Sequence, residues 1–468
     1  MTKSLTEAGR AYVETYGCQM NVADGELMEG ILAADGYEIV SSPEEADVIL
    51  VNTCAIRDHA ERRVLGRIGQ LSGLKRGHPG LLIGVTGCMA QRLGRTLFNQ
   101  ASQVDLVVGP DAYRSLPDQL RRLRGQRGET EVEAKPCVVR PGKRRTQLAV
   151  LDLDPEESYE GLEQRREAGA SAWVPIQRGC DHRCTFCIVP YVRGPEKNRR
   201  PEEVVAEVRG LAARGVTEVT LLGQTVNSYR RGDWNFARLL REFARIAGIR
   251  RVRFTSPHPN DVTRELVEVM TEEEAVCEHL HLPVQSGSDQ VLRRMLRRYT
   301  VESYLEKVRM AREAIPDLSL STDIIAAFPG ETRSDFEATL DLVREVGFDE
   351  AYTYRYSPRE GTPAMRLPAE DFLPEPEARA RLAELITVCR EIQGGINAGE
   401  VGRQDEVLVE RDARDPGQVL GRTRRNKFVA FPSEGIGIGE YAWIELTGTT
   451  GATFQGALVG SLAAGAHR

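Results

Sequence analysis

The chain has 468 residues, and 62 Lys and Arg against 69 Asp and Glu give a net charge of −7, which does not by itself indicate a nucleic-acid binder. A hydrophobic content of 41% is enough for the cores of two or three domains. No apolar run reaches about eighteen residues, and residues 1–7 lack the apolar core of a signal peptide, so we expect no membrane span and no export. Nine cysteines in such a chain favour metal or redox chemistry in a reducing compartment, and we expect a cytoplasmic protein.

The first third of the chain alternates apolar runs with helical patterns. The runs at 12–18, 46–54, 81–88 and 106–110 predict a parallel sheet with helices on its faces. Cys18, Cys54 and Cys88 each stand at the carboxyl end of a strand, the edge where such sheets bind ligands. A single cysteine there is more often a small apolar residue, but three at one edge predict a metal site with one open position. Three cysteines elsewhere in the chain have no partner at ligand spacing: Cys137, Cys277 and Cys389.

A loop with three cysteines follows a charged stretch at 128–165, which we interpret as a connection between domains. A strand at 173–177 leads into Cys180-x3-Cys184-x2-Cys187, and three close thiolates commonly hold iron–sulfur or zinc. A chain of this length needs no disulfide framework. A closed zinc site would take His182 from between the first two cysteines and form a cramped tetrahedron. We therefore expect an open cluster.

Repeated strand–helix units make up the middle of the chain. The strands are expected at 173–177, 216–223, 251–256, 279–285, 318–325 and 350–356. Six units are too few for a closed eight-stranded barrel, so the pattern predicts a partial barrel with an open side that can admit a macromolecular substrate. Its site would lie where the strands end, at Gly223, Gln224, Ser256, Gln285 and Asp323. Polar residues at these places are also ordinary caps of barrel strands, and placement alone leaves both interpretations open.

The last part of the chain changes to short strands with Gly-rich turns. Strands at 405–410, 427–431 and 441–446 predict a compact antiparallel barrel. One turn gathers basic side chains beside an aromatic ring, which suits phosphate contact and stacking on a base or ribose. We expect RNA contacts from Arg422, Arg424, Arg425, Lys427 and Phe428. A module for interactions of another kind is the alternative.

The central cysteine loop, with Phe186 before its last cysteine at the first strand of a six-unit barrel, resembles the radical S-adenosylmethionine (SAM) superfamily. The resemblance implies a 4Fe-4S cluster on Cys180, Cys184 and Cys187 whose open iron binds SAM, and radical chemistry that belongs to the cofactor. It also implies that Gly223 and Gln224 lie near the methionine amino group. The full set of implied SAM contacts is Phe186, Gly223, Gln224, Ser256, Gln285 and Asp323.

Further motifs, spread over nearly the whole chain, resemble those of the methylthiotransferases within this superfamily. They occupy residues 16–21, 52–54, 87–88, 190–194, 255–259, 281–288, 328–332 and 356–364. The resemblance implies a second 4Fe-4S cluster on Cys18, Cys54 and Cys88, which presents sulfur. It also implies an RNA-binding TRAM domain at the end of the chain. We expect a cluster-binding domain at 9–127, a linker at 128–165, a radical SAM core at 166–397 and the TRAM domain at 399–462.

The segment Gln19-Met20-Asn21 favours the tRNA-modifying branch of this family over the branch that acts on a ribosomal-protein aspartate. The implied reaction adds a methylthio group to C2 of N6-(dimethylallyl)adenosine at position 37 of tRNA, giving 2-methylthio-N6-(dimethylallyl)adenosine. The implied partners are the tRNA anticodon stem-loop, a flavodoxin- or ferredoxin-like electron donor and a sulfur donor, and we expect a monomer. The alternatives are N6-threonylcarbamoyladenosine in tRNA as substrate, the ribosomal-protein aspartate, and an iron–sulfur RNA-binding protein without turnover.

Overall fold

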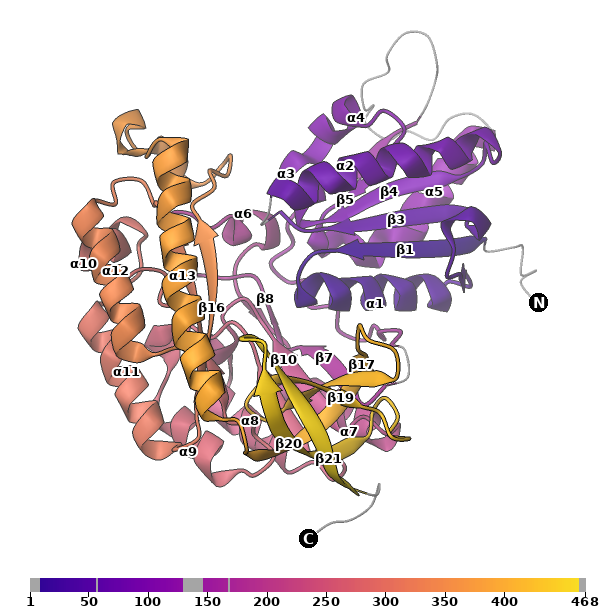
Figure 1. Ribbon diagram of the computed structural model, residues 1–468. Helices are drawn as coiled ribbons and strands as arrows, with labels where there is room; N and C mark the ends of the chain where they lie inside the picture. Colours follow the sequence, from indigo (N-terminus) through magenta and orange to yellow (C-terminus); the bar gives the residue numbers. More distant parts are fainter. Residues whose placement is uncertain (1–8, 56–57, 129–145, 167–168, 463–468) are drawn as a thin grey trace. The chain divides into compact units, whose positions relative to one another are not determined.

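The computed structural model describes residues 9–55, 58–128, 146–166 and 169–462 (Figure 1). The chain forms two compact units. Unit 1 contains the described residues up to 167 together with 178–182 and 188–197. Unit 2 contains residues 169–177, 183–187 and 198–462. The boundary therefore passes twice through the central cysteine loop.

Unit 1 is built on a six-stranded sheet in which every pair of neighbours is parallel (Figure 1). In the order of the sheet the strands are β2 (Glu38–Ile39), β1 (Arg10–Tyr16), β3 (Val48–Thr53), β4 (Leu82–Gly87), β5 (Leu106–Val108) and β6 (Leu148–Val150). The four predicted strands are present. The structure differs at β6, which lies inside the stretch interpreted as a connection yet pairs with β5. This strand was not predicted, because three apolar residues in a charged stretch are too few to show the alternation of a strand.

Helices cover both faces of this sheet because β3, β4 and β5 are buried on both sides. Val48 and Leu50 pack with α1 (Gln19–Ala34) and α5 (Leu116–Gly128) on one face. Ile49 and Val51 pack on the other face with α2 (Asp58–Ser72), α3 (Cys88–Leu93) and α4 (Leu97–Gln100). The short helix α6 (Val189–Arg193) also belongs to unit 1.

Unit 2 begins with the predicted parallel barrel strands. They are β7 (Ser171–Pro175), β10 (Glu218–Leu222), β13 (Arg251–Phe254), β14 (His279–His281), β15 (Ser319–Ala326) and β16 (Glu350–Arg355). They form the sheets β7-β10-β13 and β14-β15-β16, and a bridge from Val252 to Val276 links β13 to the residues before β14. Among the described strands, β7 and β16 each pair on one side only, so the predicted open barrel is confirmed.

The helices of unit 2 alternate with these strands and pack on their outer, apolar face. They are α7 (Pro201–Ala213), α8 (Phe236–Ala244), α9 (Arg264–Glu272), α10 (Asp289–Arg294), α11 (Val301–Ala314) and α12 (Arg333–Val346), followed by the long α13 (Glu375–Gly399). Short strands complete this part: β8 (Gln177–Arg178), β9 (Lys197–Asn198), β11 (Arg230–Arg231) and β12 (Trp234–Asn235). No helix in the described ranges is both long and apolar enough to cross a membrane.

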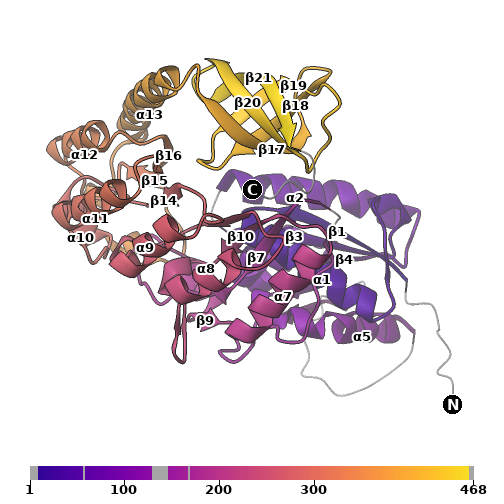
Figure 2. The ribbon, with the colours of Figure 1, turned by 90° about the horizontal axis from the view of Figure 1, so that it is seen from below.

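The chain ends in a closed five-stranded barrel with the order β17-β18-β19-β21-β20 (Figure 2). Its strands are β17 (Gln404–Asp412), β18 (Gln418–Thr423), β19 (Phe428–Pro432), β20 (Tyr441–Thr449) and β21 (Thr453–Leu462). The predicted small barrel is confirmed, but β19 and β21 pair in parallel. An odd number of strands cannot alternate in direction around a closed ring, so one parallel pair is required.

Candidate metal centres

The first cysteine triad lies where the sequence predicts it, at the carboxyl ends of the neighbouring strands β1, β3 and β4. Cys54 follows Thr53 directly, Cys88 is the first residue of α3, and Cys18 is the N-cap of α1. The Cys18 thiol is hydrogen-bonded with Cys54, and this bond is the main cause that lowers the pKa of Cys18 to about 6. The positive charge of Arg193 acts in the same direction, against burial. Cys18 is therefore readily available as a thiolate, the form that binds metal.

Two glycines allow these strand ends to approach one another. Gly17 has φ 150°, and a Cβ there would lie 2.7 Å from the Cβ of Cys54. Gly87 has φ 91°, and a Cβ there would lie 2.5 Å from the carbonyl oxygen of Thr53. Both positions therefore need glycine, for the backbone conformation and for the close contact. Each precedes a candidate ligand by one residue.

The Gln-Met-Asn segment after Cys18 has a structural role in this site. Asn21 accepts a hydrogen bond from the Cys18 thiol at 3.3 Å through Oδ1. Its Nδ2 donates to Asn52 Oδ1 at 3.3 Å, and Asn52 Nδ2 donates to the Asn21 carbonyl at 2.7 Å. Asn21 and Asn52 are fully buried, so this network fixes the start of α1 against the end of β3.

Sequence reasoning missed the residue that contacts the third cysteine. Arg193, in the 190–194 motif, donates from Nε to Cys88 Sγ at 3.1 Å. Burial raises the pKa of the Cys88 thiol, and the guanidinium opposes that rise. The same guanidinium donates from Nη2 to the buried Asp24 at 2.6 Å. The sequence did show a basic residue inside the 190–194 motif, but it gave no indication of what that residue contacts.

The second triad is divided between the units, and each part is anchored separately. In unit 1, Cys180 is buried and its backbone N–H donates to the Gly194 carbonyl at 3.2 Å. In unit 2, the Cys184 thiol accepts from Arg297 Nη1 at 3.4 Å, and Cys187 is partly exposed. Arg297 is itself held by Tyr299, whose hydroxyl accepts from Nε at 3.0 Å. The eight cysteines of the described ranges are all free thiols, which excludes disulfides among them.

Phe186, between Cys184 and Cys187, is held by aromatic packing within unit 2. Its ring stands edge-on to Phe328, with centroids 6.4 Å apart. The neighbouring Thr185 donates to the Arg294 carbonyl at 2.9 Å and receives a backbone hydrogen bond from Ala364 at 2.9 Å. These contacts fix the position of residues 183–187 within unit 2.

Two of the residues expected to contact SAM have unusual backbone conformations. Ser256 follows β13 with φ 58°, and Gln285 follows β14 with φ 69°. Ala327, which follows β15 with φ 60°, shares the conformation and was not foreseen. Each costs about 1–2 kcal/mol for a residue that is not glycine. Such strain gathers where a ligand site needs a particular backbone shape.

Gln224 and Asp323 offer different acceptors at the ends of the barrel strands. The Oε1 atom of Gln224 is buried and has no hydrogen-bond partner in the described protein. An ammonium group, such as that of SAM, would satisfy it. Asp323 lies beside His281, with Oδ2 3.4 Å from Nε2, and the His281 ring stands edge-on to Tyr352. Sequence reasoning missed His281 and Tyr352, although the alternation along β14 and β16 places both on the face that carries Asp323.

The basic turn of the terminal barrel, predicted to contact RNA, makes ion pairs within unit 2. Arg424 pairs with Glu278 at 2.7 Å, Arg425 with Glu400 at 2.6 Å, Lys427 with Asp349 at 2.7 Å, and Arg422 donates to Glu410 at 2.7 Å. Phe428 lies under Arg422, with the guanidinium 5.6 Å from the ring centroid. The sequence alone could not show these ion pairs. A turn that docks onto its own protein and a turn that binds RNA are both rich in cations, and the acidic partners lie elsewhere in the sequence.

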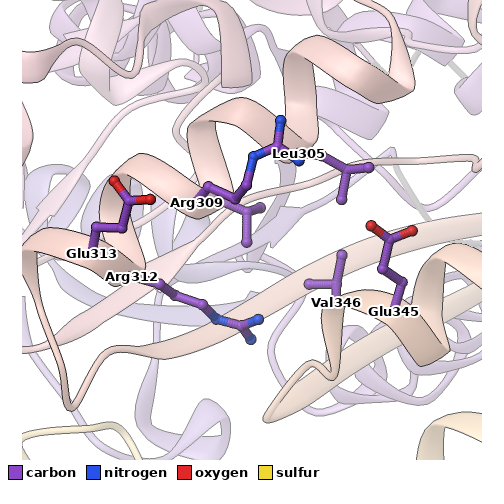
Figure 3. Close-up of a pocket in the computed structure, with 7 residues that line it drawn as sticks. Leu305, Arg309, Arg312, Glu313, Glu345 and Val346 are labelled. Atoms are coloured by element: carbon purple, nitrogen blue, oxygen red, sulfur yellow. The ribbon is translucent and has the colours of Figure 1, made fainter.

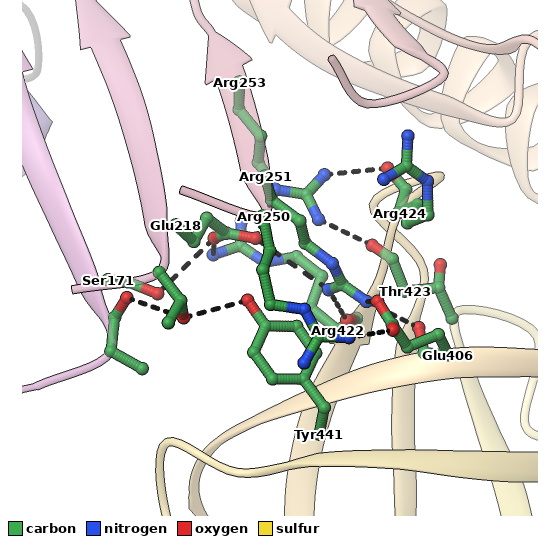
Figure 4. A network of polar contacts seen from close by, with 12 residues as sticks. Ser171, Glu218, Arg250, Arg251, Arg253, Glu406, Arg422, Thr423, Arg424 and Tyr441 are labelled. Carbon is green, nitrogen blue, oxygen red and sulfur yellow. Dashed lines mark hydrogen bonds and ion pairs between the residues drawn. The ribbon is translucent and has the colours of Figure 1, made fainter. Parts of the chain in front are cut away.

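Figure 4 shows how this turn meets the barrel strands. Arg253 donates to the carbonyls of Thr423 and Arg424 at 2.7 and 2.9 Å, and to Glu218 Oε2 at 3.0 Å. Arg251 donates to the Arg422 carbonyl and to Glu406, each at 2.8 Å. Burial alone would raise the pKa of Glu218, but the guanidinium groups of Arg253, Arg422 and Arg251 together lower it. The terminal barrel is therefore joined to the open barrel of unit 2 by buried, paired charges.

A pocket of about 300 Å³ lies elsewhere, between α11 and α12 (Figure 3). Arg309, Arg312, Glu313 and Glu345 contribute its polar side chains, and Leu305, Val308 and Val346 its apolar ones. None of the predicted site residues lines it. We assign no part of the candidate chemistry to it.

Family models match three separate parts of the chain. Residues 10–109 match an uncharacterized protein family, UPF0004, residues 174–343 match the radical SAM superfamily, and residues 399–459 match the TRAM domain. The open barrel and its three-cysteine loop thus define a radical SAM protein. The tRNA-2-methylthio-N(6)-dimethylallyladenosine synthase of Chloroherpeton thalassium is 41% identical over 456 residues, which cover 97% of each chain. The chain belongs to this family of synthases.

Other relatives support the same assignment. The synthase of that name from Moorella thermoacetica is 44% identical over 439 residues, or 92% of this chain and 94% of its own. Among solved structures, TsrM from Kitasatospora setae, a radical S-adenosylmethionine methyltransferase with cobalamin and a [4Fe-4S] cluster bound, matches with a TM-score of 0.54. The match covers 88% of this chain and 80% of TsrM at 14% identity, so the likeness concerns the fold alone.

Proposed function

We propose that this protein is a methylthiotransferase that adds a methylthio group to C2 of N6-(dimethylallyl)adenosine at position 37 of tRNA. The observation that carries the proposal is the presence of two cysteine triads in one chain. The second triad is the loop of the radical SAM core, and the first ends three neighbouring strands of a separate sheet. A radical SAM enzyme that only cleaves SAM does not need the first triad.

The residues of the first triad fit a 4Fe-4S cluster. Cys18 and Cys54 are close enough to share a hydrogen bond, and Cys88 lies beside a permanent positive charge that favours its thiolate. Cys18, Cys54 and Cys88 would hold this cluster, and Cys180, Cys184 and Cys187 would hold the other. Three thiolates leave one iron of each cluster open to an external ligand.

The residues around the second triad fit SAM as the external ligand of that cluster. Gln224 would accept from the methionine ammonium group, for which its buried carbonyl oxygen is available. Gly223, Ser256, Gln285 and Asp323 would line the same ends of the strands, and Phe186 would hold the loop beside them. When bound, a reduced cluster together with SAM supplies one-electron chemistry, which an unactivated aromatic carbon such as C2 requires.

The TRAM domain and the open barrel side support tRNA as the substrate. A base in an anticodon loop can leave its stack at low cost and enter an open site. The proposed RNA contacts are Arg422, Arg424, Arg425, Lys427 and Phe428, and the ion pairs of this turn leave the Arg422 and Arg424 side chains partly exposed. The proposal further includes a monomeric enzyme in the cytoplasm, where tRNA is found, a flavodoxin- or ferredoxin-like electron donor and a sulfur donor.

Anaerobic reconstitution tests the proposal. The full-length protein with SAM, a reductant and tRNA carrying N6-(dimethylallyl)adenosine should yield 5′-deoxyadenosine and the 2-methylthio nucleoside, both measured by mass spectrometry. About eight irons per chain are expected for two clusters, and about four would contradict the first cluster. Product formed only on N6-threonylcarbamoyladenosine or on a ribosomal-protein aspartate would reassign the substrate. Iron without any turnover would leave a non-catalytic RNA-binding protein.

The variant Cys54→Ala separates the two triads. It removes one ligand of the first cluster and leaves the central loop unchanged. We expect loss of the methylthio product with cleavage of SAM retained. Loss of both activities would contradict separate roles for the two triads.

A further inference from the structure

Helix α6 brings an arginine into the first metal centre from a distant part of the chain. Val189 lies two residues after Cys187 in the sequence, yet the helix packs within unit 1. Ile188 and Val192 form one apolar cluster with Ala55 and Cys88. The helix ends at Arg193, so this packing holds the base of the Arg193 side chain beside the third cysteine.

Two of the three guanidinium nitrogens of Arg193 have hydrogen-bond partners. Nε donates to Cys88 Sγ at 3.1 Å, and Nη2 donates to Asp24 Oδ2 at 2.6 Å. Only 4% of the Arg193 side chain is exposed, and none of the Asp24 side chain. The other oxygen of Asp24 pairs with Arg178 Nη1 at 2.9 Å, and the Arg178 guanidinium stacks over Tyr159. Two guanidinium groups therefore orient one carboxylate, and that carboxylate orients Arg193 toward Cys88.

The charges of this group do not balance without the cysteines. Arg178 and Arg193 are both cationic and 6% or less exposed, whereas Asp24 supplies a single negative charge. Lys197, the next buried cation in this part of unit 1, already pairs with Asp111 at 2.6 Å. A buried charge without a counter-charge is strongly disfavoured. One surplus positive charge beside three thiols favours an anionic group at this place.

Arg193 also has a free hydrogen-bond donor for an anionic group at this place. In the described protein Nη1 of Arg193 is buried and has no hydrogen-bond partner, although it belongs to the guanidinium that contacts Cys88. Buried donors are almost always satisfied in functional proteins. A cluster sulfide, or a sulfur bound at the open iron, is an acceptor of suitable charge.

We propose that Arg193, oriented by Asp24, is a positioning residue of the first cluster: it donates to the sulfur of Cys88 and to an anionic sulfur held at the same site. This inference rests on the proposed function, since it assumes the first cluster. Donors to cluster or ligand sulfur stabilise the reduced, more negative state and raise the reduction potential. Arg193 thus makes the first cluster easier to reduce and fixes the Cys88 side chain. Arg297, which donates to Cys184, provides the matched residue for the second cluster.

The test isolates each cluster in the full-length chain. Replacing Cys180, Cys184 and Cys187 with Ala leaves the first cluster, with about four irons per chain, and replacing Cys18, Cys54 and Cys88 leaves the second. Into each background we would introduce Arg193→Gln, Arg193→Lys and Arg297→Gln. The measurements are iron content and the midpoint potential from anaerobic redox titration followed by electron paramagnetic resonance.

The expected result is specific to one cluster. Arg193→Gln should move the first cluster to a more negative potential or release its iron, and leave the second unchanged. Arg193→Lys, which keeps the charge but loses the forked donors, should give an intermediate potential. Arg297→Gln should show the reverse specificity.

Two results would overturn the inference. The first is Arg193→Gln with full iron at an unchanged potential. The second is loss of iron in both backgrounds, which would indicate a general role in folding. If the parent background for the first cluster binds no iron, the two-cluster proposal fails as well, so the two failures are distinguishable.

Discussion

Neutralising Glu218 should destabilise unit 2, because this carboxylate is the buried counter-charge where the terminal barrel meets the core. The Glu218 side chain is 1% exposed and lies 3.0 Å from Arg253 Nε. In Glu218→Gln, Arg251 keeps Glu406 and Arg422 keeps Glu410, whereas Arg253 keeps only carbonyl partners. Leaving one buried guanidinium without its counter-charge costs about 3–5 kcal/mol, and the retained amide acceptor favours the lower value.

Tryptophan fluorescence measures this effect selectively, because the three tryptophans, Trp173, Trp234 and Trp443, all belong to unit 2. At about 2 °C per kcal/mol for a large unit, a loss of about 3 kcal/mol lowers the unfolding midpoint by roughly 6 °C. The control is Glu337→Gln, which removes an exposed ion pair to Arg333 and should change the midpoint by about 1 °C or less. Equal midpoints for the two variants would refute the docking role of this network.

Three further predictions concern the two sites and pH. Gly87→Ala should lower the stability by about 2 kcal/mol and release iron from the first cluster, because φ is 91° and the new Cβ would meet the Thr53 carbonyl. The control Gly66→Ala, where no atom lies within 4 Å of the new Cβ, should be neutral or slightly stabilising in thermal unfolding. Equal iron contents in the two variants would contradict the role of Gly87. Gln224→Leu should weaken SAM binding about tenfold or more in equilibrium dialysis, and an unchanged dissociation constant would remove Gln224 from the site. The pKa of Glu218 is lower in the folded protein than its ordinary value of about 4.5. The difference in stability between wild type and Glu218→Gln should therefore be constant above about pH 4.5 and shrink as the pH falls through the pKa of the folded state. A difference that grows on acidification would exclude the ionised Glu218 as its cause.

The sequence was sufficient for the elements with a strong local signal. Buried strands such as β3 and β4 show continuous apolar runs, and the cysteine after each run has a defined place at the sheet edge. The six barrel strands were equally clear, because each alternates with a helix of ordinary length. The placement of Ser256 and Gln285 at strand ends also followed from the sequence, but their left-handed backbone did not.

Pairings between distant residues could not be predicted. Arg193 and Asp24 are 169 positions apart, and Arg424 and Glu278 are 146 apart. A local pattern records that a residue is basic but not whether its partner is a carboxylate in the same fold or a phosphate outside it. The ion pairs of the basic turn were not foreseen for that reason. Arg193 had no assigned role for the same reason.

The network at the terminal barrel has a consequence for the order in which the chain folds. Arg251, Arg253 and Glu218 leave the ribosome well before Glu406 and the carbonyls of 422–424, which complete their hydrogen bonds. Until those residues emerge, the two guanidinium groups have Glu218 but lack their other hydrogen-bond partners, so the core cannot reach its final stability during synthesis. Domains usually fold one after another from the amino terminus. Here the last segment made completes the interior of the unit that precedes it, and a chain that stops near residue 400 would keep those arginines hydrated and the strands around them loosely packed.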